Sequence, residues 1–167
     1  MFIEYTAAMH KTINLDIVPF APHHRDAFLR LNLAWLEAHG LLEPYDLEVL
    51  KNPEVMVLEK GGEIYVGMVD DEVVSTLALT PVRKGVVELN KMAVRGDFQA
   101  RGIGQRLMRF AIQRCQSKGV TCIELYSHSS LKSALHIYAK FGFQEVPMVE
   151  GCMYDLANIH MQLCLGD

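Results

Sequence analysis

The sequence predicts one α/β domain, an α+β arrangement in which helices cover both faces of a mixed sheet of about seven strands. The first observation is the order of elements: a strand, two helices, three strands joined by short turns, and then a helix, a strand, a helix and two strands. Strands joined by hairpins pair antiparallel and strands joined through helices pair parallel, so this order predicts a mixed sheet. The second observation is composition: of 167 residues, 50% are hydrophobic and 22% are charged, which is typical of a globular domain with its own core.

The N-terminal part of the domain is expected to contain one strand and two helices. Residues 12–18 alternate polar and apolar side chains and predict the first strand. Apolar residues recur at helical spacing over 23–39, which predicts a long helix. Asp46 is placed to cap a second, short helix that ends before Pro53. Residues 54–60 fit either a strand or a helix.

The remaining elements are separated by glycines and by short polar turns. We expect the last strand to lie at an exposed edge of the sheet, where a second copy of the chain could pair with it to form a homodimer. The predicted elements are three strands at 63–69, 73–80 and 86–94, a helix at 102–118, a strand at 120–126, a helix at 130–141, and two closing strands at 143–147 and 158–165.

Charge, cysteine spacing and hydropathy exclude several classes of protein. The formal net charge of −4 argues against a nucleic-acid binder, which needs clustered basic charge. The four cysteines form no C-x-x-C pair, so we expect no metal site and interpret them as buried free thiols in a reducing cytoplasm. No apolar run approaches the ~20 residues that span a bilayer, so no membrane segment is expected. Residues 1–11 lack the pattern of a signal peptide and are interpreted as a tail that precedes a single domain over 12–167.

The turn between strand 86–94 and helix 102–118 has the character of an anion site. The first backbone N–H groups of a helix have no partner within the helix, and the helix dipole favours an anion there. Gly102 and Gly104 leave room for a ligand, while Gln99 and Arg101 add side-chain donors, so phosphate is the expected guest. The alternative is an ordinary turn whose glycines serve backbone geometry alone. The turn lacks the third glycine of a dinucleotide-binding fingerprint and the Gly-Lys-Ser/Thr of a P-loop.

Two linked motifs resemble those of the GCN5-related N-acetyltransferase (GNAT) superfamily. From Val94 to Gly104 the chain reads VRGDFQARGIG, similar to the family's pyrophosphate-binding segment Q/R-x-x-G-x-G/A, and from Ala134 to Phe143 it reads ALHIYAKFGF, similar to A-x-x-L-Y-x-K-x-G-F. The resemblance implies a sheet whose central strands splay apart, with acetyl-CoA between them and no metal. It implies that Met92, Ala93 and Val94 make main-chain contacts to the pantetheine arm. It also implies that a second segment binds the pyrophosphate: Gln99, Ala100, Arg101, Gly102, Ile103 and Gly104. His128 lies near a position where the family often has asparagine, and it is either a replacement contact or a solvated loop residue.

The resemblance also suggests the catalytic groups. Tyr138 matches the family's tyrosine, which is placed to protonate the leaving sulfur, although its helical face also suits a core residue. Glu88 lies on the strand expected to line the cleft and is the candidate base, acting directly or through water, unless it is an exposed strand residue. Alternation places Glu88, Asn90, Met92 and Val94 on one side of that strand, provided that no bulge intervenes.

The amine acceptor is expected to lie against the two helices after the first strand. There Glu37, Glu43 and Asp46 could attract a cationic amine and Trp35 and Tyr45 could wall a pocket, although charged residues at helix ends are usually solvated or capping. The function implied is therefore acetyl transfer from acetyl-CoA to a primary amine of a small molecule or peptide, directly in a ternary complex. A non-catalytic acyl-CoA-binding or regulatory module is the alternative, because a fold does not fix an activity. A nucleotide-binding α/β protein is disfavoured by the missing third glycine.

Overall fold

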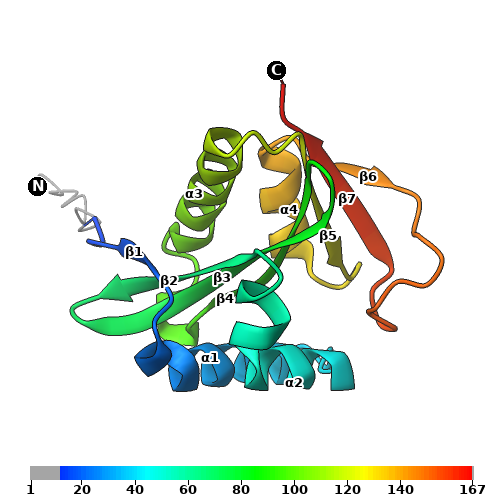
Figure 1. Cartoon of the computed structure of the whole chain (residues 1–167). Helices are drawn as coiled ribbons and strands as arrows, with labels where there is room; N and C mark the ends of the chain where they lie inside the picture. Colours follow the sequence, from blue (N-terminus) through cyan, green and yellow to red (C-terminus); the bar gives the residue numbers. More distant parts are fainter. Residues whose placement is uncertain (1–11, 167) are drawn as a thin grey trace, which may run out of the picture.

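The computed structural model describes residues 12–166 and shows one seven-stranded sheet with two helices against each face (Figure 1). The predicted order of elements is confirmed. The expected tail over residues 1–11 lies outside the described residues. The strands are β1 (Asp16–Pro19), β2 (Glu63–Val69), β3 (Glu72–Arg83), β4 (Val86–Val94), β5 (Cys122–Ser127), β6 (Gln144–Val146) and β7 (Ile159–Cys164).

The sheet is mixed, as expected. Its strand order is β1-β2-β3-β4-β5-β7-β6, and β4 and β5 pair parallel whereas every other neighbouring pair is antiparallel. The expectation that the last strand lies at an edge is wrong, because β7 lies between β5 and β6. The chain reaches β6 first and then returns along β5, which leaves the three-residue β6 at the edge.

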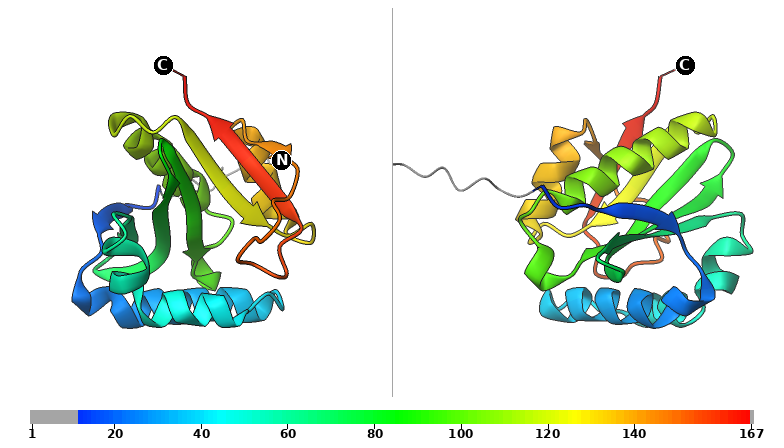
Figure 2. Two further views of the ribbon diagram at one scale, coloured as in Figure 1. Left: turned by 45° about the vertical axis from the view of Figure 1, so that its right-hand side comes forward. Right: turned by 90° about the vertical axis from the view of Figure 1, so that its left-hand side faces the viewer.

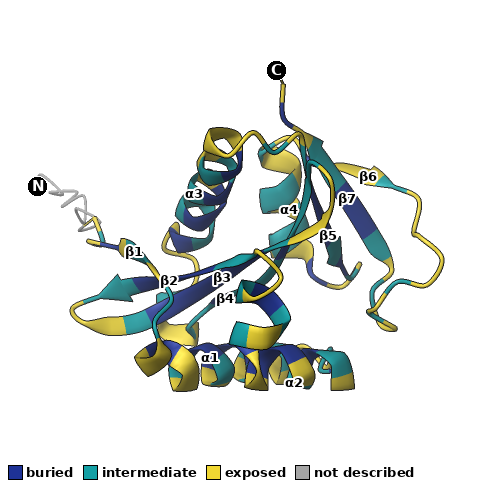
Figure 3. Ribbon diagram, in the orientation of Figure 1, coloured by how far each residue is buried: buried dark blue, intermediate teal, exposed yellow. Residues whose placement is uncertain are grey.

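The helices complete two separate hydrophobic cores. On one face, α1 (Arg25–Ala38) and α2 (Pro44–Lys51) bury Phe28, Val49 and Leu50 against the sheet. On the other face lie α3 (Ile103–Ser117) and α4 (Lys132–Lys140). The apolar residues of α3 that are four apart in the sequence are all buried, which forms the stripe that an amphipathic helix needs (Figures 2 and 3).

Strands β4 and β5 pair only at their beginnings. Their parallel register covers Val86–Glu88 and Cys122–Glu124, and beyond this point the two strands separate. In the same region β4 contains a bulge, because it has one residue more than β3 between the pairs Thr76–Ala93 and Ala78–Asn90. Lys91 lies in the bulge with φ of 50°. The bulge interrupts the expected alternation from Glu88 to Val94.

Several element boundaries differ from the expectation, for local reasons. Asp46 does not cap α2: Glu43 occupies the N-cap, Pro44 begins the helix with its fixed φ, and Asp46 accepts the backbone N–H of Glu43 from within the first turn. Residues 54–58 form a single π-helical turn, so the helical alternative was correct there. Of the four cysteines only Cys115 is buried, so the expectation that all four are buried is wrong.

Candidate functional site

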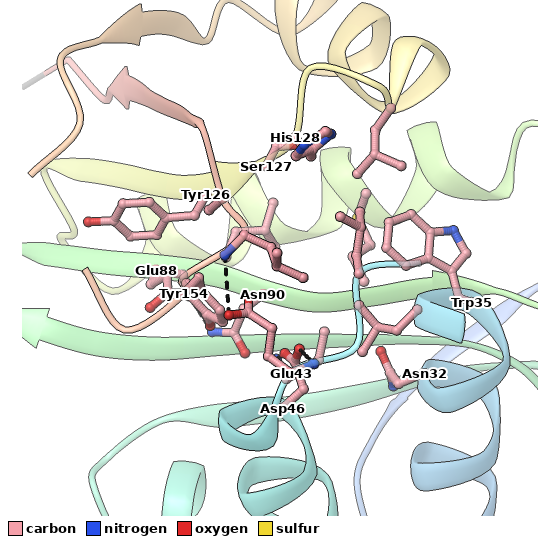
Figure 4. Close-up of a pocket in the computed structure, with 18 of the residues that line it drawn as sticks. Asn32, Trp35, Glu43, Asp46, Glu88, Asn90, Tyr126, Ser127, His128 and Tyr154 are labelled. Carbon is pink, nitrogen blue, oxygen red and sulfur yellow. Dashed lines mark hydrogen bonds and ion pairs between the residues drawn. The ribbon is translucent and has the colours of Figure 1, made fainter. Parts of the chain in front are cut away.

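A pocket with an empty volume of about 780 Å³, part of it open to solvent, lies where β4 and β5 separate (Figure 4). Its walls come from α1, the start of α2, the middle of β4, the end of β5, the start of α4 and the loop between β6 and β7. Eight residues singled out from the sequence line it: Trp35, Glu43, Asp46, Glu88, Asn90, Met92, His128 and Tyr138. Helices far apart in the sequence thus contribute to one cavity at the gap in the sheet.

Glu88 projects into this pocket from β4, just where the pairing with β5 ends. The hydroxyl of Tyr154 donates a hydrogen bond of 2.8 Å to Glu88 Oε1. Burial raises the pKa of the Glu88 carboxyl above its usual value, and the bond from Tyr154 opposes only part of this shift. A raised pKa makes a carboxylate a stronger base, so Glu88 is better suited to accept a proton than an ordinary glutamate, whose low pKa makes it a weak base.

Tyr138 reaches the pocket from α4. Its ring packs against the core that contains α3, with the centroid 6.0 Å from that of Phe143. Burial raises the pKa of Tyr138 to about 12, so the phenol keeps its proton at neutral pH. Tyr138 is therefore part of the core and part of the pocket wall at once, and its role as a proton donor remains a prediction.

A buried ion pair forms the floor of the pocket beside Tyr154. Lys91 Nζ lies 2.6 Å from Asp46 Oδ1, and the two side chains are only 5% and 4% exposed. The same ammonium lies 5.2 Å from the centroid of the Tyr154 ring. The pair joins the bulge of β4 to α2, so it fixes the strand that lines the gap to the helix beneath it.

Glu43 is used within the protein rather than held open for a ligand. Its Oε1 accepts hydrogen bonds from the backbone N–H groups of Asp155 at 2.6 Å and Leu156 at 3.2 Å. The side chain therefore ties the β6–β7 loop to the start of α2, across more than a hundred residues of sequence. Through this tie Tyr154 and Leu156 become walls of the pocket.

The other residues expected at the acceptor and cofactor ends differ in position. Trp35 lines the pocket and stacks on His39 with centroids 4.5 Å apart. Tyr45 does not line it, but packs edge-on against Tyr154 from behind. His128 lies at the end of β5, where its Nδ1 accepts the backbone N–H of Ser130 at 3.1 Å, so Nε2 is the nitrogen left for another contact.

The turn before α3 has the backbone shape of an anion site. Gly102 with φ of 82° and Ala100 with φ of 57° are both in the left-handed region, which curls the chain so that successive N–H groups converge. The first intrahelical bond there is donated by Arg106 N–H to the Gly102 carbonyl, so the preceding N–H groups of the first turn lack such a bond. A Cβ at Gly104 would lie 3.5 Å from Ile137, an ordinary contact. These features fit a pyrophosphate.

The side chains of this turn behave differently from its backbone. Gln99 donates to the Val94 carbonyl at 3.0 Å and so closes the turn, and the Arg101 guanidinium lies over the ring of Phe98 at 4.9 Å. None of residues 99–104 lines the described pocket. The candidate anion site is therefore separate from the pocket, and the end of β4, where Met92 lines the pocket, leads along the chain to it.

The pocket residues that sequence reasoning missed include Lys91, Tyr126 and Tyr154. Tyr154 comes from an irregular loop, and neither periodicity nor a motif marks it. A lysine in the middle of an apolar strand was the one available signal, because a buried lysine needs a partner. Among the described residues no group of three or more metal-ligating side chains occurs, and no described helix is long and apolar enough to cross a membrane.

Comparison with known proteins supplies a family. The model of the Acetyltransferase (GNAT) family matches residues 25–143. An uncharacterized N-acetyltransferase of Bacillus subtilis, YvbK, is 30% identical over 105 residues, which are 61% of this chain and 68% of that protein.

Solved structures agree on the fold. A GNAT-family acetyltransferase from Staphylococcus aureus has a TM-score of 0.82 at 20% identity, over 91% of this chain and 99% of that one. A Bacillus subtilis acetyltransferase in complex with CoA has a TM-score of 0.70 at 24% identity, over 90% of this chain and 99% of that one.

Proposed function

The chain belongs to the GNAT family of acetyltransferases, and we propose that it moves an acetyl group from acetyl-CoA directly to a primary amine in a ternary complex. The observation that carries this proposal is the pocket at the separation of β4 and β5. A candidate base, Glu88, and a candidate acid, Tyr138, line the same cavity from opposite sides of the gap. Holding both reactants between two such groups requires no covalent enzyme intermediate.

The residues that would hold acetyl-CoA are the turn before α3 and the last residues of β4. The converging N–H groups of Gly102–Gly104 suit the pyrophosphate, and the B. subtilis structure of the same fold is a complex with CoA. Acetyl-CoA, when bound, supplies the acetyl group as an activated thioester. His128 Nε2 is a further donor at the end of β5.

The backbone of β4 offers a donor for the thioester oxygen. The Arg95 N–H bonds to the Val74 carbonyl of β3 at 2.8 Å. Because successive amides of a strand point to opposite sides, the Val94 N–H is directed toward the open β5 side. Between the backbone N–H groups of Ala93 and Val94, this direction favours that of Val94 as the donor that stabilises negative charge on the thioester oxygen.

The side chains divide the proton transfers. Glu88, with its raised pKa, accepts a proton from the incoming ammonium directly or through one water, so that the amine can attack. Tyr138, with a pKa of about 12, holds a proton at neutral pH that it can donate to the departing sulfur. The ammonium loses two protons on becoming an amide: Glu88 takes the first and passes it to solvent, and the second, lost from the nitrogen after attack, balances the proton that Tyr138 gives to the sulfur.

The test is release of thiol from acetyl-CoA with a panel of polyamines, amino acids, aminoglycosides and peptides with free N-termini. Amine-dependent release with at least one class, together with an acetylated product by mass spectrometry, is the expected result. If CoA binds but no amine accelerates release above hydrolysis, the chain is a non-catalytic acyl-CoA-binding module.

A further inference from the structure

Three of the four charged side chains of the pocket already have partners that hold its walls together. Four of its described lining residues carry a full charge at neutral pH when unperturbed: Glu43, Asp46, Glu88 and Lys91. Asp46 and Lys91 form the buried ion pair of 2.6 Å. Glu43 accepts two backbone N–H groups of the β6–β7 loop through one oxygen. A ligand cannot recruit these three groups without breaking contacts that hold the walls in place.

Glu88 is different, because its one hydrogen-bond partner is a side-chain hydroxyl and it holds no backbone group of another segment in place. Its hydrogen bond comes from the Tyr154 phenol, which leaves the carboxylate charge uncompensated by any cation at contact distance among the described residues. An ammonium group placed against Glu88 would therefore gain an ion pair. The rings of Tyr126 and Tyr154, with centroids 5.8 Å apart, add aromatic surface near Glu88 (Figure 4).

Much of the rest of the wall is aromatic or aliphatic, beside the polar side chains of Asn32, Asn90, Ser127 and His128. Trp35 closes the pocket from α1, and Leu131 and Leu156 line it from α4 and from the β6–β7 loop. Figure 4 places Trp35 and His128 at the opposite end from Glu88, Tyr126 and Tyr154, so an acceptor held at Glu88 has apolar surface alongside it. Removing such surface from water favours a ligand with a comparable apolar body.

On the premise of the proposed function, we infer that the acceptor is a primary amine borne on an aromatic or alkyl group that carries no second charge, neither an anionic group on the carbon that carries the amine nor a further ammonium. A substrate carboxylate would enter a site whose lysine is buried and already bound to Asp46. Burying an unpaired carboxylate in such a site costs desolvation free energy, and contacts with the apolar walls do not offset that cost. A second ammonium, as in a polyamine, would likewise gain no second carboxylate there.

The direct experiment compares amines that share one ring. Phenethylamine, phenylalaninamide and phenylalanine differ only in the substituent next to the amine: hydrogen, neutral amide or carboxylate. Thiol release from acetyl-CoA gives kcat/KM for each, expressed per free amine because the substituents change the amine's own basicity. We expect the two neutral compounds to exceed phenylalanine by about 10²-fold or more, and phenethylamine to exceed spermidine.

A substitution tests whether the ion pair sets this preference. Asp46→Asn removes the partner of Lys91 and leaves an ammonium that a substrate carboxylate can neutralise. The preference for phenylalaninamide over phenylalanine should fall by about tenfold or more. Asp26→Asn, the same change at an exposed position of α1 outside the pocket, should leave the ratio at its wild-type value.

The outcomes distinguish a failure of the inference about the acceptor from a failure of the proposed acetyl transfer. Equal use of phenylalanine and phenylalaninamide by the wild type, or a preference for spermidine, overturns the inference while leaving acetyl transfer intact. No thiol release with any amine overturns the proposed function itself. If Asp46→Asn folds and its ratio is unchanged, the ion pair does not exclude carboxylates; if it does not fold, the wild-type ratios decide.

Discussion

Two glutamates of the sheet have opposite acidities because their neighbours differ. Glu63 on β2 accepts hydrogen bonds from Arg114 at 2.8 and 2.9 Å and from Lys118 at 2.6 Å, which hold its pKa at about 2. Glu88 on β4 has only a neutral phenol at contact distance, and burial raises its pKa. The first environment suits a structural anchor, whereas the second suits a group that accepts a proton more readily than an ordinary glutamate does.

Glu88→Gln keeps the size of the side chain and removes its basicity. We expect kcat/KM of the wild type to fall as pH drops through the raised pKa, because the protonated carboxyl cannot act as a base. The variant should lose about 10²-fold in kcat/KM near neutral pH and recover part of it at alkaline pH, where the amine is already neutral. A pH–rate profile with one amine measures this, with Glu145→Gln on the exposed edge strand as control. Parallel profiles of equal height would remove Glu88 from the mechanism, and a uniform loss would indicate positioning only.

Tyr138→Phe removes one hydroxyl and keeps the ring that packs against the core. The phenol has a pKa of about 12 and is protonated over the working range, so its loss should lower kcat by about 10²-fold. Coenzyme A affinity, measured by calorimetry, should stay within about threefold, which serves as the internal control. A kcat within two- or threefold of the wild type would show that Tyr138 serves only the core.

The turn from β4 into α3 acts as a unit in the proposed anion site, to which its curled backbone and the start of the helix both contribute N–H groups. Gly104→Glu places a carboxylate among these N–H groups, where two like charges at about 4 Å repel by about 4 kcal/mol at an effective dielectric constant of 20. Coenzyme A affinity should fall by up to about 10³-fold. Gly104→Ala is the matched control, because its Cβ meets Ile137 at an ordinary 3.5 Å and should leave affinity close to wild type. Unchanged affinity in a natively folded Gly104→Glu protein would place the phosphates elsewhere.

The other end of α3 is held to β2 through Glu63. Its folded-state pKa of about 2 lies below the ordinary value of 4.5, so the stabilisation is fully present above about pH 4.5 and is lost as pH falls toward 2. Glu63→Gln should lower the free energy of unfolding by about 1–2 kcal/mol at pH 7, with a difference that shrinks through this window. Urea unfolding at several pH values measures it, with the exposed Glu59→Gln as control. A difference independent of pH would show that the charge of Glu63 contributes nothing.

At the scale of the molecule, local pattern predicted most of the fold. Strand alternation, helical spacing and glycine stops gave the order of elements, because each signal depends on residues within a few positions of one another. The bulge at Lys91 was not predictable, since it is defined by pairing with β3 and not by the residues of β4 alone. The position of β7 inside the sheet was also missed, because strand order depends on long-range pairing.

The two parts of the site also differ in how far local sequence predicts them. The phosphate-binding turn is contiguous in the sequence, so a motif could predict it. The acceptor pocket is assembled by long-range contacts, such as Tyr154 with Glu88 across 66 residues and Asp155 with Glu43 across 112. Glu43 and Asp46 are bound to other parts of the protein, Glu43 by Asp155 and Asp46 by Lys91. Glu88 is therefore the carboxylate proposed to face the ligand.

The central claim is that acetyl transfer takes place in the gap between β4 and β5. A crystal structure of the chain with coenzyme A tests it most directly. The account predicts the pyrophosphate on the N–H groups of residues 102–104, the pantetheine arm along Met92–Val94, and the sulfur within hydrogen-bond reach of the Tyr138 hydroxyl. Coenzyme A bound outside this gap, or with its sulfur directed away from Tyr138 and the Glu88 pocket, would contradict the account.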